Sequence, residues 1–138
     1  MNRIKAGLVI LFCSGLLAAC SSTPTWKGMS ENEIAAWRTM GVEAAEAQTY
    51  RKAGLDYSAI EAWRGAGLSN SEAILDWHKA GWTPETAKPW LNARFDLESA
   101  IEWQKEKFTA TQARKWVDGG FSLRKAKENR AKGLAPVS

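Results

Sequence analysis

Residues 112–124 read QARKWVDGGFSLR, and the order of residue types in this stretch recurs along the chain. Trp116 is followed four residues later by a glycine, then by an apolar residue and then by a serine. The segments that begin at Trp63 and Trp77 have the same layout, with threonine in place of serine in the second. The recurrence indicates an internal repeat, which decides the fold class.

All copies of the repeat can be recognised when the chain is aligned on this aromatic position. The residues found there are Trp37, Tyr50, Trp63, Trp77, Trp90, Trp103, Trp116 and, in a degenerate last copy, Asn129. They are 13 residues apart, except for one step of 14 between Trp63 and Trp77. The residue three places before and the residue five places after are apolar in every copy. The repeat therefore runs from about Ser30 to Leu134, and most of the eight tryptophans belong to it.

One long helix does not fit this period. At about 100° per residue, successive aromatic positions are rotated by roughly 220° and form no continuous stripe. Strands do not fit either, because the apolar positions are separated by three residues rather than two. We therefore expect one short helix per copy, which gives an all-α array of about eight short helices. The array is either solenoid-like or a compact helical coil.

Residues at both ends of each copy support this assignment. The position seven residues before the aromatic one holds a good N-cap in seven copies. Those residues are Ser30, Asp56, Asn70, Thr83, Asp96, Thr109 and Ser122, and Glu43 is the exception. Ser30 with Glu33 and Thr109 with Gln112 predict capping boxes. Pro84 fits the first helical position, and glycine four residues after the aromatic position predicts a left-handed helix ending.

The residue after this glycine, which we call the clamp residue, should pack on two helices at once. In a Schellman ending it folds back on the aromatic residue, and it also precedes the next N-cap. Phe121 should therefore contact both Trp116 and Ala126. Most of the aromatic column becomes core, which leaves Trp26, Trp82 and Tyr57 as the rings expected to be free.

Copies five and six depart from the pattern. Pro89 falls inside a helix and should kink it, because it removes a backbone hydrogen bond. Arg94 and Lys107 replace glycine, so the chain there either takes a strained left-handed turn or continues as helix. Residues Pro89, Arg94 and Lys107 are a candidate partner-binding region, and tolerated drift within a many-copy array is the other interpretation.

The first residues have the layout of a secretory signal. Arg3 and Lys5 precede an uncharged apolar run that is too short to span a bilayer, and small residues follow it. The ending Leu17-Ala18-Ala19-Cys20 resembles the lipobox of bacterial lipoprotein precursors. The resemblance implies a signal peptide at 1–19, lipidation of Cys20 and a lipidated tether at 20–29. Ser21, in place of Asp, implies the outer membrane, with the domain facing the periplasm.

The remaining domains are a helical repeat domain at 30–134 and a C-terminal tail at 135–138. The last copy is basic, which is typical of a solvated final helix and could also attract an anionic partner. Cys13 leaves with the signal peptide and Cys20 carries the lipid, so the mature chain has no thiol for a disulfide. Export argues against nucleic acid as a partner.

Few residues of the sequence suggest a catalytic or metal-binding site. His78 is the only histidine, and it takes the place of arginines that we expect to face solvent. Most carboxylates stand at expected N-caps or first turns, where helix formation accounts for them. We therefore expect no enzyme activity, no metal site and no cofactor. The expected function is a membrane-anchored protein-interaction or scaffolding module of the cell envelope. The alternative is a lipoprotein that binds peptidoglycan or another glycan through exposed aromatic rings.

Overall fold

The computed structural model describes residues 25–136, which form eight α-helices and contain no β-strand. The helices are α1 (Glu31–Thr39), α2 (Ala44–Lys52), α3 (Tyr57–Ala66), α4 (Ser71–Lys79), α5 (Pro84–Asn92), α6 (Leu97–Lys105), α7 (Ala110–Asp118) and α8 (Leu123–Ala131). Each has nine residues except α3, which has ten. The predicted array of eight short helices is confirmed. The predicted signal peptide and Cys20 lie outside the described residues.

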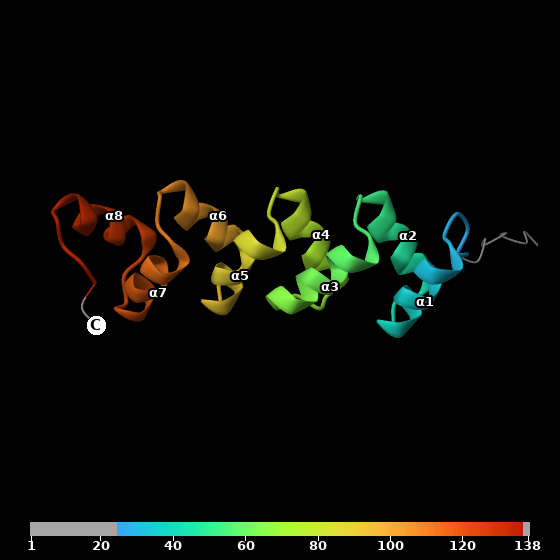
Figure 1. Ribbon diagram of the computed structural model, residues 1–138. Coiled ribbons are helices and arrows are strands. Elements are labelled where there is room, and N and C mark those ends of the chain that lie inside the picture. Colours follow the sequence, from blue (N-terminus) through green and yellow to red (C-terminus); the bar gives the residue numbers. More distant parts are fainter. Residues whose placement is uncertain (1–24, 137–138) are drawn as a thin grey trace, which may run out of the picture.

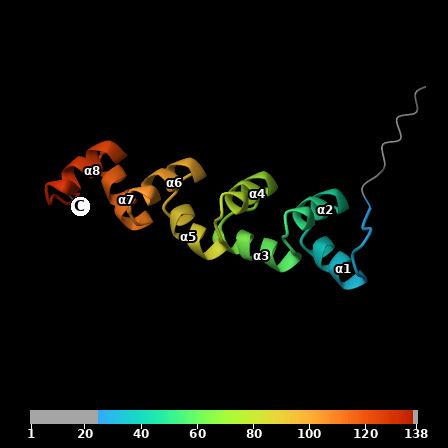
Figure 2. The same cartoon turned by 90° about the horizontal axis from the view of Figure 1, so that it is seen from above.

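The helices form an elongated array of two layers. In Figures 1 and 2 the odd-numbered helices lie in one layer and the even-numbered helices in the other. Each odd-numbered helix packs on the next odd-numbered one, so α1, α3, α5 and α7 form a continuous row. The even-numbered helices end along the top of Figure 1, and the odd-numbered helices end along the bottom. The array is thus solenoid-like, and it has two distinct edges.

The N-caps begin the helices as predicted. Seven cap side chains accept a hydrogen bond from the backbone N–H of the third helical residue, and only Glu43 makes none. The capping boxes of Ser30 and Thr109 are present. A third box joins Thr83 to Thr86, and the sequence pattern missed it because threonine is not the usual partner. Each cap satisfies a backbone donor that the first helical turn leaves unpaired.

All eight helices end in the same paired hydrogen-bond motif. After α7, the Phe121 N–H donates to the Trp116 carbonyl and the Gly120 N–H donates to the Val117 carbonyl, both at 2.9 Å. The same two bonds recur in every copy, and they define the Schellman motif. Arg94 and Lys107 take the left-handed turn with φ of 61° and 63°, so the strained alternative is the observed one. Helix α5 continues through Pro89 to Asn92.

The aromatic column is core. From Trp37 to Trp116 every aromatic residue of the column is at most 5% exposed. The aromatic clamp residues contact the rings of the column edge to face, as in the run Trp77–Trp82–Trp90 with centroid separations of 5.1 and 6.2 Å, whereas Trp37 and Tyr50 are stacked. The expectation that Trp82 is free is wrong. It is 6% exposed because its clamp position places it between two helices. Phe121 meets Trp116 at 5.2 Å as predicted, and Tyr57 is exposed.

The end of the predicted tether is part of the folded array. The Gln48 side chain donates to the carbonyls of Thr25 and Lys27, at 3.0 and 2.9 Å. Trp26 is half-buried against the core, and the Arg38 guanidinium lies 5.5 Å from its ring centroid. Residues 25–29, the end of the predicted tether, are therefore docked on the array, and the expectation that Trp26 is a free ring is wrong.

Candidate functional site

Side chains of α3, α4, α7 and α8 link each of these helices to the end of the one two places earlier. The clearest cases are Arg64 in α3, whose Nη1 donates to the Met40 carbonyl at 2.7 Å, and Arg130 in α8, whose Nη2 donates to the Glu106 carbonyl at 2.7 Å. The accepting carbonyls belong to the last turns of helices α1 and α6, where intrahelical donors are missing. These arginines therefore hold successive units of one layer together.

His78 belongs to the same set of contacts. Its Nε2 lies 3.1 Å from the Ala53 carbonyl at the end of α2, and its side chain is half-buried. The expectation that this column faces solvent is therefore wrong for His78 and Arg64, which the two-layer packing brings against an earlier helix end. Sequence periodicity within a single copy holds no signal for this contact, because the partner lies two copies away.

The candidate partner-binding residues do not form one site. Pro89 and Arg94 are exposed on α5 and on the turn after it. Lys107 is exposed on the turn after α6. Because α5 and α6 end at opposite edges of the array (Figure 1), Arg94 and Lys107 stand on different edges. A single ligand that contacts both would have to cross the width of the array.

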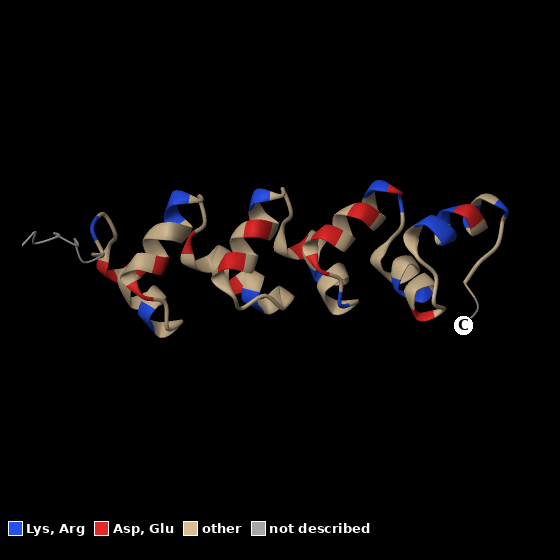
Figure 3. Ribbon diagram, turned by 180° about the vertical axis from the view of Figure 1, so that it is seen from behind, with Lys and Arg blue, Asp and Glu red and all other residues tan. Residues whose placement is uncertain are grey.

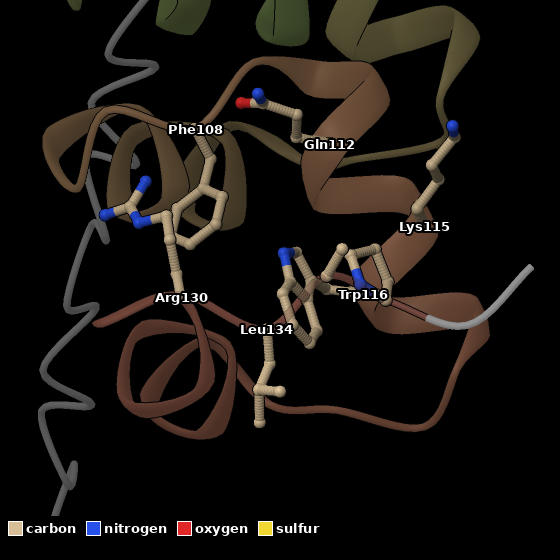
Figure 4. A pocket seen from close by; sticks show the side chains of 8 residues that line it. Phe108, Gln112, Lys115, Trp116, Arg130 and Leu134 are labelled. Carbon is tan, nitrogen blue, oxygen red and sulfur yellow. The ribbon is translucent and has the colours of Figure 1, made fainter. Parts of the chain in front are cut away.

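The C-terminal end holds a shallow pocket of about 310 Å³, shown in Figure 4. Its lining includes Phe108, Gln112, Lys115, Trp116, Arg130 and Leu134. The Arg130 guanidinium lies 3.8 Å from the centroid of the Phe108 ring and is also bound to the Glu106 carbonyl. Leu134 is 55% exposed. The pocket lies beside α8, the last helix of the described residues, and the Arg130 guanidinium in it is already engaged within the fold.

The perturbed titratable groups are explained by the helices themselves. The Ser99 backbone N–H lowers the pKa of Asp96, and the Ala59 backbone N–H lowers the pKa of Asp56, as expected for N-cap carboxylates. Burial, and then the hydrogen bond to Glu46, raises the pKa of Tyr50 to about 12. Residues 25–136 contain no group of three His, Cys, Asp or Glu side chains that could hold a metal ion.

Basic residues of the last helix are largely paired. Arg124 and Lys125 both bind Glu128, and Lys127 binds Glu106 at the end of α6. This pairing agrees with a solvated final helix. Its face is polar where earlier helices carry an aromatic ring, because Asn129 stands at the aromatic position. Helix α8 thus closes the core in the manner of a terminal repeat with a polar outer side.

Comparisons with known proteins identified no relative of this chain. No family model, no curated protein and no solved structure matches this chain. No helix among the described residues is long and apolar enough to cross a membrane.

Proposed function

We propose that this chain is a non-enzymatic, membrane-anchored lipoprotein whose helical array binds another protein of the cell envelope. The observation that carries this proposal is the burial of the aromatic column. Seven aromatic residues, from Trp37 to Trp116, are used to join helices and are at most 5% exposed. A high tryptophan content is therefore explained by the architecture, and it is no longer evidence for a sugar-binding surface.

Binding of a glycan by stacking needs an exposed aromatic face. Among the described aromatic rings, Tyr57 is 40% exposed, while Trp26 is half-buried and lies beside the Arg38 guanidinium. Tyr57 itself packs edge to face on Trp37, with centroids 6.4 Å apart. These rings do not form a row along the array. The peptidoglycan alternative is therefore less well supported than a protein partner.

An elongated repeat suits a protein partner. Stacked helical units provide an extended surface whose parts keep fixed positions, and such surfaces commonly bind proteins. Here each unit is joined to earlier ones by its core and by contacts such as Arg64 to Met40. The charged side chains that are not used in these contacts are therefore held at regular intervals, which favours recognition of a partner along the length of the array.

The proposed anchor is Cys20, through acylation at the lipobox ending. A lipid anchor with more than one acyl chain holds a protein stably on a bilayer. Ser21 in the position after the cysteine supports the outer membrane, with the array facing the periplasm. The array would then present its surface to envelope proteins that reach the same membrane.

The test is site-specific photocrosslinking of the full chain in its own envelope. A photoreactive residue replaces Glu72, Lys79 or Asn92, which are exposed on different parts of the array. We expect one defined protein adduct from one of these positions. Reversing the charge of the exposed side chains beside that position should abolish the adduct, while the same change elsewhere should leave it.

Two outcomes would contradict the proposal. One is the absence of any defined adduct while the full chain is retained on purified peptidoglycan sacculi, which would favour the glycan alternative. The other concerns the anchor: the Cys20→Ser variant should be released from membranes by a high-salt wash under which the unchanged chain remains bound. Equal retention of both would reject acylation at Cys20.

A further inference from the structure

Exposed lysines recur at one edge of the array. Lys52, Lys79 and Lys105 occupy the same place in α2, α4 and α6, two residues after the aromatic position. Lys107 follows α6, Lys132 follows α8, and Lys27 lies in the docked segment before α1. We call these six residues the lysine edge. Figure 3 shows basic residues at the upper ends of the even-numbered helices, where this edge runs.

Helix chemistry alone does not explain the lysine edge. Cations are favourable near the carboxyl end of any helix, because they interact with its dipole. The odd-numbered helices end with the same geometry, yet the corresponding residues are uncharged or acidic. They are Thr39, Gly65, Asn92 and Asp118. From α2 to α6 the lysines therefore follow a period of two copies, which corresponds to the edge, and in α8 the same place is Ala131 with Lys132 next to it.

The lysine edge is also not used by the fold. All six side chains are exposed, and none forms an ion pair with another residue between 25 and 136. In contrast, Arg114 is paired with Asp118 and Lys127 is paired with Glu106. On the opposite edge, Arg38 lies beside the Trp26 ring and Arg64 is bound to the Met40 carbonyl. The lysine edge therefore holds six exposed cations without such a partner, against three elsewhere among residues 25–136, which are Lys88, Arg94 and Lys115.

Acidic side chains lie away from this edge, except for Glu106 at the end of α6, which is paired with Lys127. On the even-numbered helices they precede the lysines, for example Glu46 in α2, Asp76 in α4 and Glu102 in α6. Figure 3 shows acidic residues lower on these helices, beneath their basic ends. The array therefore has a basic edge and an acidic flank. A flat anionic surface would attract the first and repel the second, and it would orient the array.

The docked N-terminal segment places the lysine edge close to the proposed anchor. The Arg51 Nη1 donates to the Gly28 carbonyl at 2.8 Å, and Gln48 binds Thr25 and Lys27. Only residues 21–24 separate Thr25 from Cys20, and an extended chain of this length spans at most about 18 Å. A lipid on Cys20 thus keeps the α1–α2 end of the edge near the headgroups.

We infer that the lysine edge rests on the anionic headgroups of the bilayer that holds the anchor, so that the array lies along the membrane. This inference rests on the proposed lipid anchor. Each lysine near an anionic bilayer strengthens attraction by about five-fold, and salt weakens the effect because it screens exposed charges. The acidic flank then faces away from the bilayer, where an envelope protein can reach it.

The experiment measures lysine reactivity in the full chain bound to vesicles. The chain is reconstituted on phosphatidylcholine vesicles, with or without about 30% phosphatidylglycerol, and labelled with an amine reagent at low salt before mass spectrometry. We expect labelling of the lysine edge to fall at least three-fold on the anionic vesicles only, and to recover in about 0.5 M salt. Labelling of Lys88 and Lys115, which are exposed on α5 and α7, should not change.

Two sets of variants with equal charge provide the control. Lys52→Gln, Lys79→Gln and Lys105→Gln together should abolish the protection of Lys107 and Lys132. Lys88→Gln, Arg94→Gln and Lys115→Gln together should leave it intact. All six substituted side chains are exposed, and circular dichroism checks that both triple variants remain folded.

Equal labelling of the lysine edge on neutral and anionic vesicles would overturn the inference, while the crosslinking experiment would still decide the partner proposal. Protection of the edge by added polyglutamate on neutral vesicles, without protection on anionic vesicles, would assign it to an acidic protein instead. Failure of the chain to float with either kind of vesicle would reject the anchor itself, and this inference with it.

Discussion

The guanidinium of Arg64 and the backbone carbonyl of Met40 are joined across 24 positions of the sequence by a hydrogen bond of 2.7 Å. Met40 is the C-cap of α1, and Arg64 lies in the last turn of α3. The bond gives a donor to a carbonyl that its own helix leaves unpaired. It also holds α3 against α1, so the unpaired carbonyl at one helix end is satisfied by a contact between repeats.

Replacing Arg64 by methionine should therefore destabilise the array. Arg64→Met keeps an apolar stem but leaves the Met40 carbonyl without this donor. We expect a loss of about 1–2 kcal/mol in the free energy of unfolding. Urea denaturation measures it, and Lys88→Met, at an exposed position on α5, is the control with a change within about 0.5 kcal/mol. Equal effects of the two changes would show that the hydrogen bond does not stabilise the fold.

The aromatic column makes a larger contribution. Trp116 is 3% exposed and meets Phe121 at 5.2 Å, so Trp116→Ala removes a ring from the contact between two helices. We expect a loss of about 3–5 kcal/mol in urea denaturation. Lys115→Ala, at the exposed neighbouring position, is the control. A loss below about 0.5 kcal/mol for Trp116→Ala would contradict its assignment to the core.

Two helix endings have a strained backbone conformation that a substitution by glycine can relieve. Arg94 and Lys107 have φ of 61° and 63°, a left-handed conformation that costs a residue with a side chain roughly 1 kcal/mol. Arg94→Gly and Lys107→Gly should each raise the free energy of unfolding by about this amount. Thermal and urea denaturation should agree, since the change affects the folded backbone at one turn.

The converse substitution, glycine to alanine, tests the same left-handed conformation at two other helix endings. At Gly41 and Gly81 φ is 70° and 85°, and a Cβ atom built there meets nothing within 4 Å. Gly41→Ala and Gly81→Ala should therefore destabilise through backbone conformation alone, by about 1 kcal/mol each. Destabilisation by Arg94→Gly together with stabilisation by Gly81→Ala would reverse the expected signs and reject this explanation.

The N-cap carboxylates predict how stability depends on pH. Asp96 accepts a hydrogen bond from the Ser99 N–H at 2.8 Å, which lowers its pKa below the ordinary value of 3.8. A lowered pKa in the folded state stabilises the fold above the unfolded pKa, and this contribution disappears as the pH falls through the folded pKa. We expect the unfolding free energy to decrease in acid, from about pH 5 downward, and Asp96→Asn to flatten this decrease.

Asparagine is as good an N-cap as aspartate, so Asp96→Asn should retain the helix at neutral pH. The matched opposite change is Asn70→Asp, at the equivalent position of α4, where the side chain accepts from the Ala73 N–H. Asn70→Asp should make the free energy of unfolding fall more steeply in acid than it does in the unchanged protein. Unfolding curves between pH 2 and 7 measure both variants, and parallel curves for all three proteins would show that the caps do not carry the pH dependence.

Local features could be predicted because their causes lie within a few residues. Ser30 caps α1 through Glu33, and Phe121 returns to Trp116 across five positions. The Thr83–Thr86 box was missed for a local reason, since threonine is an unusual third residue. The expectation that the Trp82 ring is free was wrong because the ring packs on Trp77 and Trp90, which belong to two different helices.

The lysine edge had a signal in the sequence that a single repeat does not display. Lys52, Lys79 and Lys105 recur at every second copy, and a comparison over pairs of copies separates them from Gly65 and Asn92. The meaning of this alternation appears only in the two-layer arrangement, because even-numbered and odd-numbered helices end at opposite edges (Figure 1).

By itself, the sequence determined the number of helices, their caps, their left-handed endings and the burial of most of the tryptophans. These features depend on hydrogen bonds and contacts within about five residues, which a 13-residue period records directly. The tertiary structure alone decided that His78 turns to Ala53, that residues 25–29 dock on α2, and that the free lysines share one edge. Each depends on the angle between successive helices, and this angle brings residues about 20 or more positions apart into contact.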